Sequence, residues 1–511
     1  MANAQSPAFK VAGQVIRRRD NRPVRGAHVS LVVPDHPDRR VSCTTGENGE
    51  FLFAGLSAGK YSLIVNYRGF SQQFRQDGAY STAIAVGSGL DSEHVVFPLD
   101  SPASIVGAVL DDAGDPVRNA TVYLFGESVD NGMRRTGLKA TVVSDSDGEF
   151  HFAHLQPGTY YGAVSGRPWY AQIPQPAAPG PNQPGPVRPE LDVAYPITYY
   201  ASATTPEAAT PITLQEGTRA EIQFNLQPVP ALHVSFGGSD KQPDQHVFAA
   251  VSTVGPGGVL LNVQTMGNDS GVGGLAPGSY ILSPLLTGPN QPIPLGSQSV
   301  TLTADSDIDV RAGVKTSIHG KISLEGDLPA NLAVALENVS NGNQMSGFVR
   351  QDGTFEIAEL PPGRYNLRLA NTSELYMNSV VMKGATYSKG QLEVVPGAQI
   401  QMNIALARGV SKIEGIAVHD GQPVAGAMVL ALPQDVSRSN YIPRDQSDSD
   451  GTFTLNYAIP GRYTLVAIDD GRGLEYANPA VVAPYLEHGR AITVPLADKA
   501  HLAVEVQPRL K

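Results

Sequence analysis

The first candidate for chemistry is a serine in a short Gly-rich segment near the N-terminus. Gly55-Leu56-Ser57-Ala58-Gly59 has the G-x-S-x-G spacing of hydrolase nucleophiles, and Ser57 with Lys60 has the S-x-x-K spacing of a second class. Both chemistries need the serine at the start of a helix, whereas the residues around Ser57 predict a turn between two strands. In the related segments described below, its counterparts are not nucleophiles: Gln156, Ala276, Pro361 and Ile459. The sequence therefore predicts no catalytic residue, and we expect a protein that is not an enzyme.

Two acidic turns and a pair of histidines are the candidates for metal binding. Asp145-Ser146-Asp147-Gly148 and Asp448-Ser449-Asp450-Gly451 resemble the opening of a calcium-binding loop. Calcium needs about six to eight oxygen ligands and the distal glutamate is missing, so hairpin turns explain both segments, with calcium as the alternative. His151 and His154 have an odd spacing on one expected strand and face opposite sides of it. We therefore expect no metal site and no cofactor.

An insertion from about Arg167 to Pro211 holds most of the aromatic side chains that we expect at the surface. It contains Pro-rich stretches at 174–176 and 179–181, whose stiffness favours a surface position. The candidate binding residues in it are Trp169, Tyr170, Tyr195, Tyr199 and Tyr200. Flat aromatic rings on a loop stack on sugars or pack in a protein groove, so a polysaccharide is one candidate partner. The favoured interpretation is that these side chains anchor the long loop on its own domain.

Composition excludes several classes of protein. The net charge of −11 argues against a nucleic-acid partner, because binding through phosphates requires positive charge. The basic cluster Arg17-Arg18-Arg19, with Arg22 and Arg25, predicts a solvated turn, with contact to an acidic polymer or partner as the alternative. The single cysteine, Cys43, excludes an intramolecular disulfide and a cysteine-based zinc site. No apolar run is long enough for a membrane span.

A pair of turns occurs repeatedly along the chain and determines the expected architecture. The first turn is Asp-Gly or Asn-Gly, then a polar residue and phenylalanine, with copies that start at Asn48, Asp147, Asp352 and Asp450. Ten residues after each turn glycine lies the glycine of a second turn, which leads into a tyrosine. A fifth copy, Pro277-Gly278-Ser279-Tyr280, keeps only the second turn. Because the spacing stays fixed while the surrounding loops vary, one structural unit is repeated.

The residue types explain what these turns position. Glycine after Asn or Asp supplies the positive φ of a tight hairpin turn. Apolar residues then alternate with a period of two, as at Phe150 and Phe152, and predict a strand with one buried face. The tyrosine opens the next strand, and by analogy with a tyrosine corner we expect its hydroxyl to bond a backbone group near the turn. Roughly seven short strands in about 85 to 130 residues indicate a β-sandwich.

The full motif also includes an opening glycine and a hairpin of the form Pro-Val-x-Gly-Ala, as at 23–27 and 423–427. In this form the pattern resembles the carboxypeptidase regulatory-like domain, a transthyretin-like (prealbumin-like) β-sandwich. The resemblance implies a non-catalytic, usually exported module used for folding support, adhesion or carbohydrate contact. It does not choose among these roles, because fold and function are separable.

We therefore expect an all-β chain of five tandem immunoglobulin-like or transthyretin-like β-sandwiches, called units 1 to 5 below. Their predicted bounds are 1–100, 101–229 with the insertion at 167–211, 230–313, 314–408 and 409–511. Units 1, 2 and 5 match the motif best, unit 4 matches in its second half, and unit 3 only at the second turn. The connectors, as at Ser101-Pro102 and Gly313-Val314, are short, so we predict a rod or a bent string with limited hinge freedom.

The leading functional hypothesis is a non-enzymatic extracellular scaffold or an adhesion and assembly subunit. Its expected partners are further copies of itself, bound through strand edges or the N-terminal arm, or other surface proteins. The alternative is a polysaccharide-binding protein that uses the aromatic insertion of unit 2. Ala2-Asn3-Ala4-Gln5 resembles a signal-peptide cleavage site behind Met1, which favours a secreted, cell-surface or periplasmic location over a cytosolic one.

Overall fold

The computed structural model describes residues 8–34, 36–172, 188–237, 246–263, 265–268, 271–287, 293–294, 297–309, 316–339, 342–361, 363–388, 390–395, 397–435, 442–495 and 499–509. The regular secondary structure of this part of the chain is almost entirely β-strand, which confirms the all-β prediction. It contains one α-helix, α1 (Pro479–Leu486), too short to cross a membrane, and three single-turn helices: η1 (Pro189–Leu191), η2 (Pro206–Ala208) and η3 (Pro256–Gly258). The segments 2–5, 174–176, 179–181 and 313–314 lie outside the described residues.

Units 1 and 2 each contain a three-stranded and a five-stranded sheet. The strands of unit 1 are β1 (Phe9–Arg17), β2 (His28–Val33), β3 (His36–Thr44), β4 (Glu50–Leu56), β5 (Gly59–Tyr67), β6 (Phe70–Gln73), β7 (Ile84–Val86) and β8 (Val95–Leu99). Those of unit 2 are β9 (Ala103–Leu110), β10 (Thr121–Asp130), β11 (Met133–Val143), β12 (Glu149–Leu155), β13 (Gly158–Ser165), β14 (Val193–Ala194), β15 (Thr198–Tyr199), β16 (Ile212–Leu214) and β17 (Arg219–Asn225), with β18 (Val229–Pro230) at the join to unit 3.

Units 3 and 4 each contain a four-stranded and a five-stranded sheet, while the strands of unit 5 form one eight-stranded sheet. The strands of unit 3 are β19 (Leu232–Gly237), β20 (His246–Val254), β21 (Leu260–Asn262), β22 (Met266–Asn268), β23 (Gly271–Leu275), β24 (Gly278–Thr287), β25 (Ile293–Pro294), β26 (Gln298–Leu302) and β27 (Ser306–Asp309). Those of unit 4 are β28 (Ser317–Ser323), β29 (Ala333–Asn338), β30 (Gln344–Phe348), β31 (Thr354–Ala358), β32 (Gly363–Ala370), β33 (Leu375–Lys383), β34 (Thr386–Ser388), β35 (Gln391–Val394) and β36 (Gln399–Arg408). Those of unit 5 are β37 (Ser411–His419), β38 (Gln422–Pro423), β39 (Met428–Pro433), β40 (Arg444–Gln446), β41 (Thr452–Ala458), β42 (Gly461–Ile468), β43 (Arg490–Val494) and β44 (Lys499–Gln507).

The same pairing occurs around the opening strand of every unit. In unit 1, β1 is antiparallel to β4 and parallel to β8. The corresponding opening strands β9, β19, β28 and β37 each have the same two kinds of partner. Unit 3, whose sequence motif is the weakest, therefore has the same local topology as the others. The division of the whole chain into five sandwiches with the bounds given above remains our proposal.

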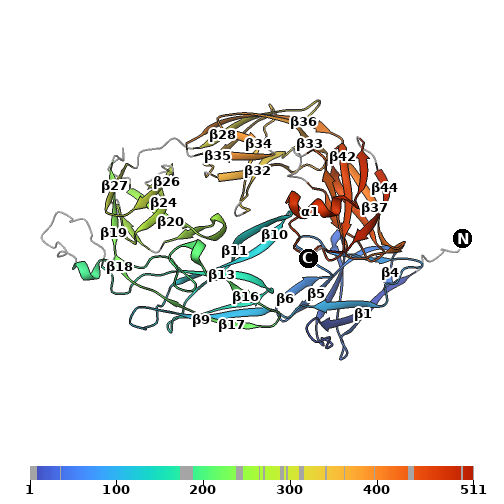
Figure 1. Cartoon of the computed structure of the whole chain (residues 1–511), viewed down its shortest axis with the longest axis horizontal. Helices are drawn as coiled ribbons and strands as arrows, with labels where there is room; N and C mark the ends of the chain where they lie inside the picture. The colour runs from blue at the N-terminus through green and yellow to red at the C-terminus, as the bar shows by residue number, and fades with distance from the viewer. Residues whose placement is uncertain are drawn as a thin grey trace.

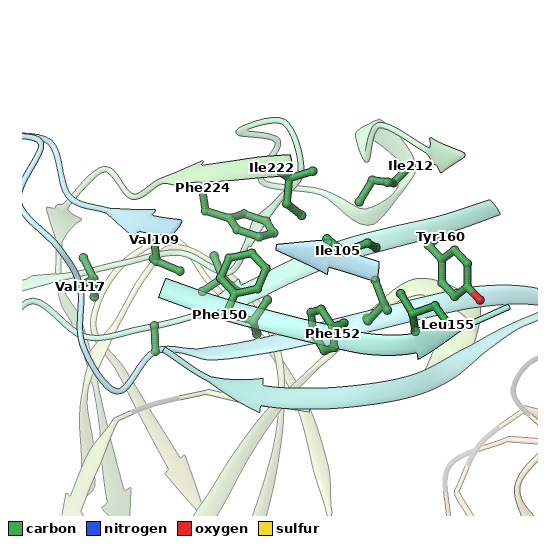
Figure 2. Close-up of a cluster of buried hydrophobic side chains, with 14 of the residues drawn as sticks. Ile105, Val109, Val117, Phe150, Phe152, Leu155, Tyr160, Ile212, Ile222 and Phe224 are labelled. Carbon is green, nitrogen blue, oxygen red and sulfur yellow. The ribbon is translucent and has the colours of Figure 1, made fainter. Parts of the chain in front are cut away.

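The glycines and phenylalanines of the motif pack against each other across this pairing. Gly107 of β9 lies opposite Phe150 of β12, and a Cβ on that glycine would lie 2.6 Å from the ring and 2.1 Å from the carbonyl of Ile222. Gly415 has the same surroundings beside Phe453. A side chain at the opening glycine would therefore displace both the ring and the parallel strand. Figure 2 shows the phenylalanine in the core of unit 2, among side chains from both sheets.

The expected tyrosine corner is present in all five copies. Tyr160 donates a hydrogen bond to the carbonyl of Gln156 at 2.8 Å, and Tyr280 of unit 3 donates to Ala276 at 2.6 Å. The other three copies make the same contact four residues upstream: Tyr61 to Ser57, Tyr365 to Pro361 and Tyr463 to Ile459. The hydroxyl thus satisfies a carbonyl of the turn while the ring enters the core.

The molecule closes on itself. Figure 1 shows the units around a closed path, with the red strands of unit 5 beside the blue strands of unit 1. Backbone atoms of Ala83 and Ser449, 366 positions apart in the sequence, are 2.9 Å from each other. The predicted rod or bent string is therefore bent into a ring, and an open rod is wrong. Short connectors limit the angle between neighbouring units. Whether the array closes into a ring depends on contacts between units that are distant in the sequence.

Candidate assembly site between units 1 and 5

The ring closes where the loop before β7 meets the turns at the end of β40 and before β41. Arg444 of unit 5 forms an ion pair with Asp77 of unit 1, and the two side chains are 5% and 16% exposed. The guanidinium carbon also lies 4.3 Å from the centre of the Tyr80 ring, which adds a cation–π contact. A buried ion pair contributes only when its geometry is favourable, and breaking it leaves a charge without a partner. This pair therefore makes separation of the two units costly.

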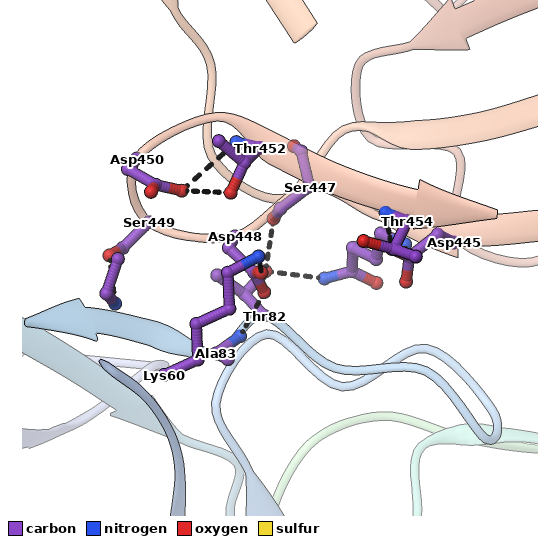
Figure 3. A network of polar contacts seen from close by, with 12 residues as sticks. Lys60, Thr82, Ala83, Asp445, Ser447, Asp448, Ser449, Asp450, Thr452 and Thr454 are labelled. Atoms are coloured by element: carbon purple, nitrogen blue, oxygen red, sulfur yellow. Dashed lines mark hydrogen bonds and ion pairs between the residues drawn. The ribbon is translucent and has the colours of Figure 1, made fainter. Parts of the chain in front are cut away.

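A second set of contacts comes from the acidic turn of unit 5. Figure 3 shows Asp448 between the two units, where it accepts a hydrogen bond from the Ala83 amide at 2.9 Å and pairs with Lys60. Ser449 adds two more bonds, since its amide donates to the Ala83 carbonyl and its hydroxyl accepts from the Ala85 amide at 2.8 Å. The turn thus bonds backbone groups at the start of β7.

Amide and guanidinium groups complete the contact. The Gln446 side chain donates to the Arg75 carbonyl at 2.6 Å and to the Thr82 hydroxyl at 2.9 Å. Arg472 of unit 5 also donates to unit 1, at the Gln76 carbonyl, whereas Arg75 of unit 1 donates in the opposite direction, to the Ala425 carbonyl of unit 5 at 2.5 Å. Because most of these bonds reach backbone atoms, the interface orients the two units precisely.

Two carboxyl groups at this contact are perturbed by burial. Desolvation raises the pKa of Asp445 to about 6, partly offset by the amides of Thr454 and Gln446, which donate to it. Desolvation also raises the pKa of Asp448, and its bond to Lys60 opposes that shift. Burial thus disfavours the charged form of both groups, and the charge on Asp445 changes in the weakly acidic range.

Unit 2 also contacts units 4 and 5. Arg134 of β11 bonds Glu475 of unit 5 at 2.8 Å, and the amide of Ala477 donates to the Gly132 carbonyl at 3.0 Å. The neighbouring Arg135 is buried and pairs with Glu337 of unit 4. One hairpin, β10–β11, therefore contacts both of the last two units.

The candidate aromatic residues do not form one surface. Trp169 is 79% exposed, and its ring makes an edge contact with Tyr170 at 5.7 Å. Tyr195 and Tyr199 are buried, the first in the core of unit 2 and the second in a cluster with residues of unit 3. Tyr200 is partly buried, and its ring centre lies 6.3 Å from that of Phe224, with the two ring planes at 76°. The structure brings together Trp169 and Tyr170 at the surface and places the other three as anchors of the insertion.

The other candidates lie where turns and strands use them. Ser57 is in the turn before β5, where its carbonyl accepts the bond from Tyr61, and Lys60 follows in the strand. Of the basic cluster, Arg18 pairs with Asp100 and Arg25 pairs with Glu47 at 3.1 Å. Cys43 is half-buried in β3, and burial raises the pKa of its thiol. Among the described residues, no group of three or more His, Cys, Asp or Glu could hold a metal ion.

Sequence reasoning missed the residues of the ring contact. The acidic turn of unit 5 was predicted as a hairpin, and this is wrong: it connects β40, which pairs with β39, to β41, which pairs with β37. Nothing in its composition indicated a partner more than 360 residues away. A second feature that we missed, a threonine or serine at a fixed distance before the turn glycine, could have been found from the sequence. The hydroxyls of Thr45, Ser144 and Ser447, each four residues before the turn glycine, bond the Pro-Val-x-x-Ala loop of their unit on both sides.

Solved structures with some likeness to this chain include two bacterial pilins and a protein of Bacillus anthracis. GBS52, the minor pilin of Streptococcus agalactiae, has 15% identity, covers 46% of this chain and 98% of its own, and has a TM-score of 0.23. The TIE protein of Bacillus anthracis has 10% identity, covers 100% and 76%, and has a TM-score of 0.18. The shaft pilin SpaA of Lactobacillus rhamnosus GG has 10% identity, covers 44% and 98%, and has a TM-score of 0.20. We draw no functional argument from likenesses at these scores.

The sequence gives a sharper comparison. No curated protein matches the chain. Residues 10–92 and 104–180, which contain the complete turn pairs of units 1 and 2, match the carboxypeptidase regulatory-like domain. This match confirms the resemblance inferred from the motif. The chain therefore carries two segments, 10–92 and 104–180, that belong to the carboxypeptidase regulatory-like domain family.

Proposed function

We propose that this chain is a non-enzymatic, exported scaffold or assembly subunit that holds its β-sandwiches as one preorganised ring. The observation that carries the proposal is the buried contact between units 1 and 5, centred on the Arg444–Asp77 ion pair. A chain of domains that serves only as an extended spacer does not need a contact between its first and last units. A ring held by contacts among units 1, 2, 4 and 5 presents its outer faces in a defined geometry to other molecules.

The residues of the motif support a structural role. The serine and lysine that could do chemistry have structural contacts: the Ser57 carbonyl accepts the corner bond from Tyr61, and Lys60 pairs with Asp448. The carboxypeptidase regulatory-like match supports export, because such modules are usually exported.

Small-angle X-ray scattering of the full chain tests the ring. We expect the wild-type profile to fit the closed arrangement at every protein concentration below the onset of assembly, and Arg444→Ala to increase the maximum dimension. The matched control is Arg25→Ala, which removes an exposed ion pair within unit 1. An extended wild-type particle would overturn the ring proposal.

The location and assembly parts of the proposal need a separate measurement. A membrane-impermeant amine reagent applied to intact source cells should label this chain, and cross-linking on those cells should join it to copies of itself or to other surface proteins. Labelling only after cell lysis would overturn the proposed location.

A second candidate function is polysaccharide binding, favoured by the exposed Trp169 and its contact with Tyr170. An indole face of this exposure can stack on a sugar ring. Binding to a glycan array with and without Trp169→Ala tests this site, with Tyr199→Phe as a control inside the fold. Equal binding by Trp169→Ala and wild type would exclude Trp169 as the binding residue.

A further inference from the structure

A groove lies between units 2 and 3, away from the ring contact. It measures about 1210 Å³. Pockets for small ligands are typically about 300–1,000 Å³, so this groove has room for an oligomeric ligand. One wall is the outer face of β20, β24 and β26 in unit 3, and the other is the end of the unit 2 insertion with η2.

The wall from unit 3 presents hydroxyl groups in a regular order. Ser279 of β24 and Thr301 of β26 are directly paired across the strands, and their hydroxyl oxygens are 3.1 Å apart. Ser299 lies two positions before Thr301 on the same face, and all three side chains are exposed. Thr253 of β20 does not belong to this row, since the pairing of Ser252 with Ile281 gives it the parity of the buried Tyr280, and its hydroxyl donates to the Ser279 carbonyl at 2.9 Å. Hydroxyls both donate and accept hydrogen bonds, so this row can serve a ligand that has the same property.

The opposite wall combines stiff apolar residues with threonines. Pro196, Ile197, Pro206, Pro211 and the ring of Tyr161 lie beside Thr136, Thr204 and Thr205. The hydroxyl of Tyr161 donates to Glu127 at 2.9 Å, and this bond restricts the orientation of the tyrosine side chain. Proline and a fixed aromatic ring lose little conformational entropy when a ligand binds.

The lining is also nearly uncharged. Among the described residues that form it, Glu207 alone carries a charge, and that side chain is exposed at the surface. A groove without cationic groups gives no electrostatic attraction to acidic polymers, and its one carboxylate offers a basic peptide a single partner. A neutral ligand needs no charged partner here.

We propose that this groove binds a neutral polysaccharide chain. A sugar ring has hydroxyls at its edge and C–H groups on its faces, which match the hydroxyl row on one side and the proline and tyrosine wall on the other. The proposal rests on the second candidate function above but places binding in the groove instead of at Trp169. It is independent of the scaffold role.

Affinity electrophoresis of the full chain in gels that contain soluble amylose, dextran or laminarin tests the proposal, with polygalacturonate as the charged comparison. We expect at least one neutral polymer to retard the wild-type chain and polygalacturonate not to. The double variant Ser279→Ala with Thr301→Val removes two exposed hydroxyls. It should weaken the affinity for that polymer about tenfold, because each lost hydrogen bond costs about 0.5–1.5 kcal/mol.

Two matched variants make the result specific. Ser283→Ala removes a hydroxyl from the same strand but outside the groove lining, and Trp169→Ala removes the exposed indole; both should bind as wild type does. Binding lost in Trp169→Ala and kept in the double variant would overturn the groove and leave polysaccharide binding at the other site. No retardation of the wild-type chain by any neutral polymer, or stronger retardation by polygalacturonate, would overturn the proposal. The scattering profile of each variant shows separately whether the closed arrangement of the units is kept.

Discussion

The turns at 145–148 and 448–451 have the same sequence, Asp-Ser-Asp-Gly, and nearly the same backbone bonds, but the side chains of their first aspartates bind different partners. In both, the amide of the turn glycine donates to the carbonyl of the first aspartate, at 3.2 Å in unit 2 and 2.8 Å in unit 5. The side chain of Asp145 turns back and accepts from the amides of Asp147 and Glu149. The side chain of Asp448 leaves its own turn and bonds Ala83 and Lys60 of unit 1.

The residue after the turn glycine accompanies this difference. In unit 5, Asp450 accepts from both the amide and the hydroxyl of Thr452, so the turn is capped by its second aspartate. Unit 4 has the same cap between Asp352 and Thr354. With the second aspartate as cap, the first is available for another partner. Identical turn motifs thus fold the backbone identically, and neighbouring residues decide which carboxylate faces outward.

The largest expected effect comes from removing the buried cation at the ring contact. Arg444→Ala leaves Asp77 buried without its partner, which typically costs about 3–5 kcal/mol. We expect this loss as a drop in the free energy of ring closure, visible as an increased maximum dimension in scattering and as a new unfolding transition at low urea. Arg444→Lys keeps the charge but loses the planar fork and should recover only part of the effect.

Replacing the first aspartate in each of the two turns tests the comparison directly. Asp448→Ala removes a charged acceptor from the Ala83 amide and from Lys60, and should destabilise the chain by about 2–3 kcal/mol and open the ring. Asp145→Ala removes an exposed local cap and should cost about 1 kcal/mol with no change in shape. Urea unfolding and scattering on both variants provide the measurement. Equal effects would mean that Asp448 is also only a turn cap.

The pH dependence of stability follows from Asp445. Its pKa is about 6 in the folded chain against 3.8 as the ordinary value, so between these values the folded state binds more protons than the unfolded state. Stability is therefore greatest on the acidic side of this window and falls as the pH rises from about 4 to 6, by at most about 3 kcal/mol. The falling contribution should disappear in Asp445→Asn, which does not titrate. A contribution from Asp445 that rises over this window would contradict the assignment.

The smallest effect is expected at the tyrosine corners, where the two units should behave alike. Tyr160→Phe and Tyr463→Phe each remove one hydroxyl bond to a turn carbonyl and keep the ring in the core. Each should cost about 1 kcal/mol in unfolding experiments, without a change in the scattering profile. A large shape change in Tyr463→Phe would show that the corner of unit 5 also supports the ring.

Much of the local fold could be predicted because its causes are local. The turn glycines have positive φ, at 74° for Gly49 and 79° for Gly451, and the five tyrosine hydroxyls bond the expected turn carbonyls. One shared local feature could not be read from residue types. Six residues after the turn glycine the chain again has positive φ, at His154, Glu359 and Tyr457 as well as at a glycine, Gly55. The pairing of β12 with β9 shifts register at His154, so the backbone there is set by the bulge in the sheet.

The candidate site divides in the same way. Trp169 lies at the surface beside Tyr170, which differs from the favoured interpretation that it anchors the loop. Tyr195 and Tyr199 are buried, as that interpretation predicted, because the loop folds back on its own unit and meets unit 3. From sequence, a tyrosine that anchors a loop cannot be told from one that faces solvent, because both have an apolar ring and a polar tip.

The amino-acid sequence by itself determined the repeated turns, the alternating strands and the glycine and tyrosine positions that make this chain all-β, because each depends on residues within one unit. Only the tertiary structure decided that the array closes into a ring, that Arg444 meets Asp77, and that Asp448 bonds unit 1. Those contacts join residues more than 360 positions apart, and their energy depends on burial and orientation that appear only once the units are placed.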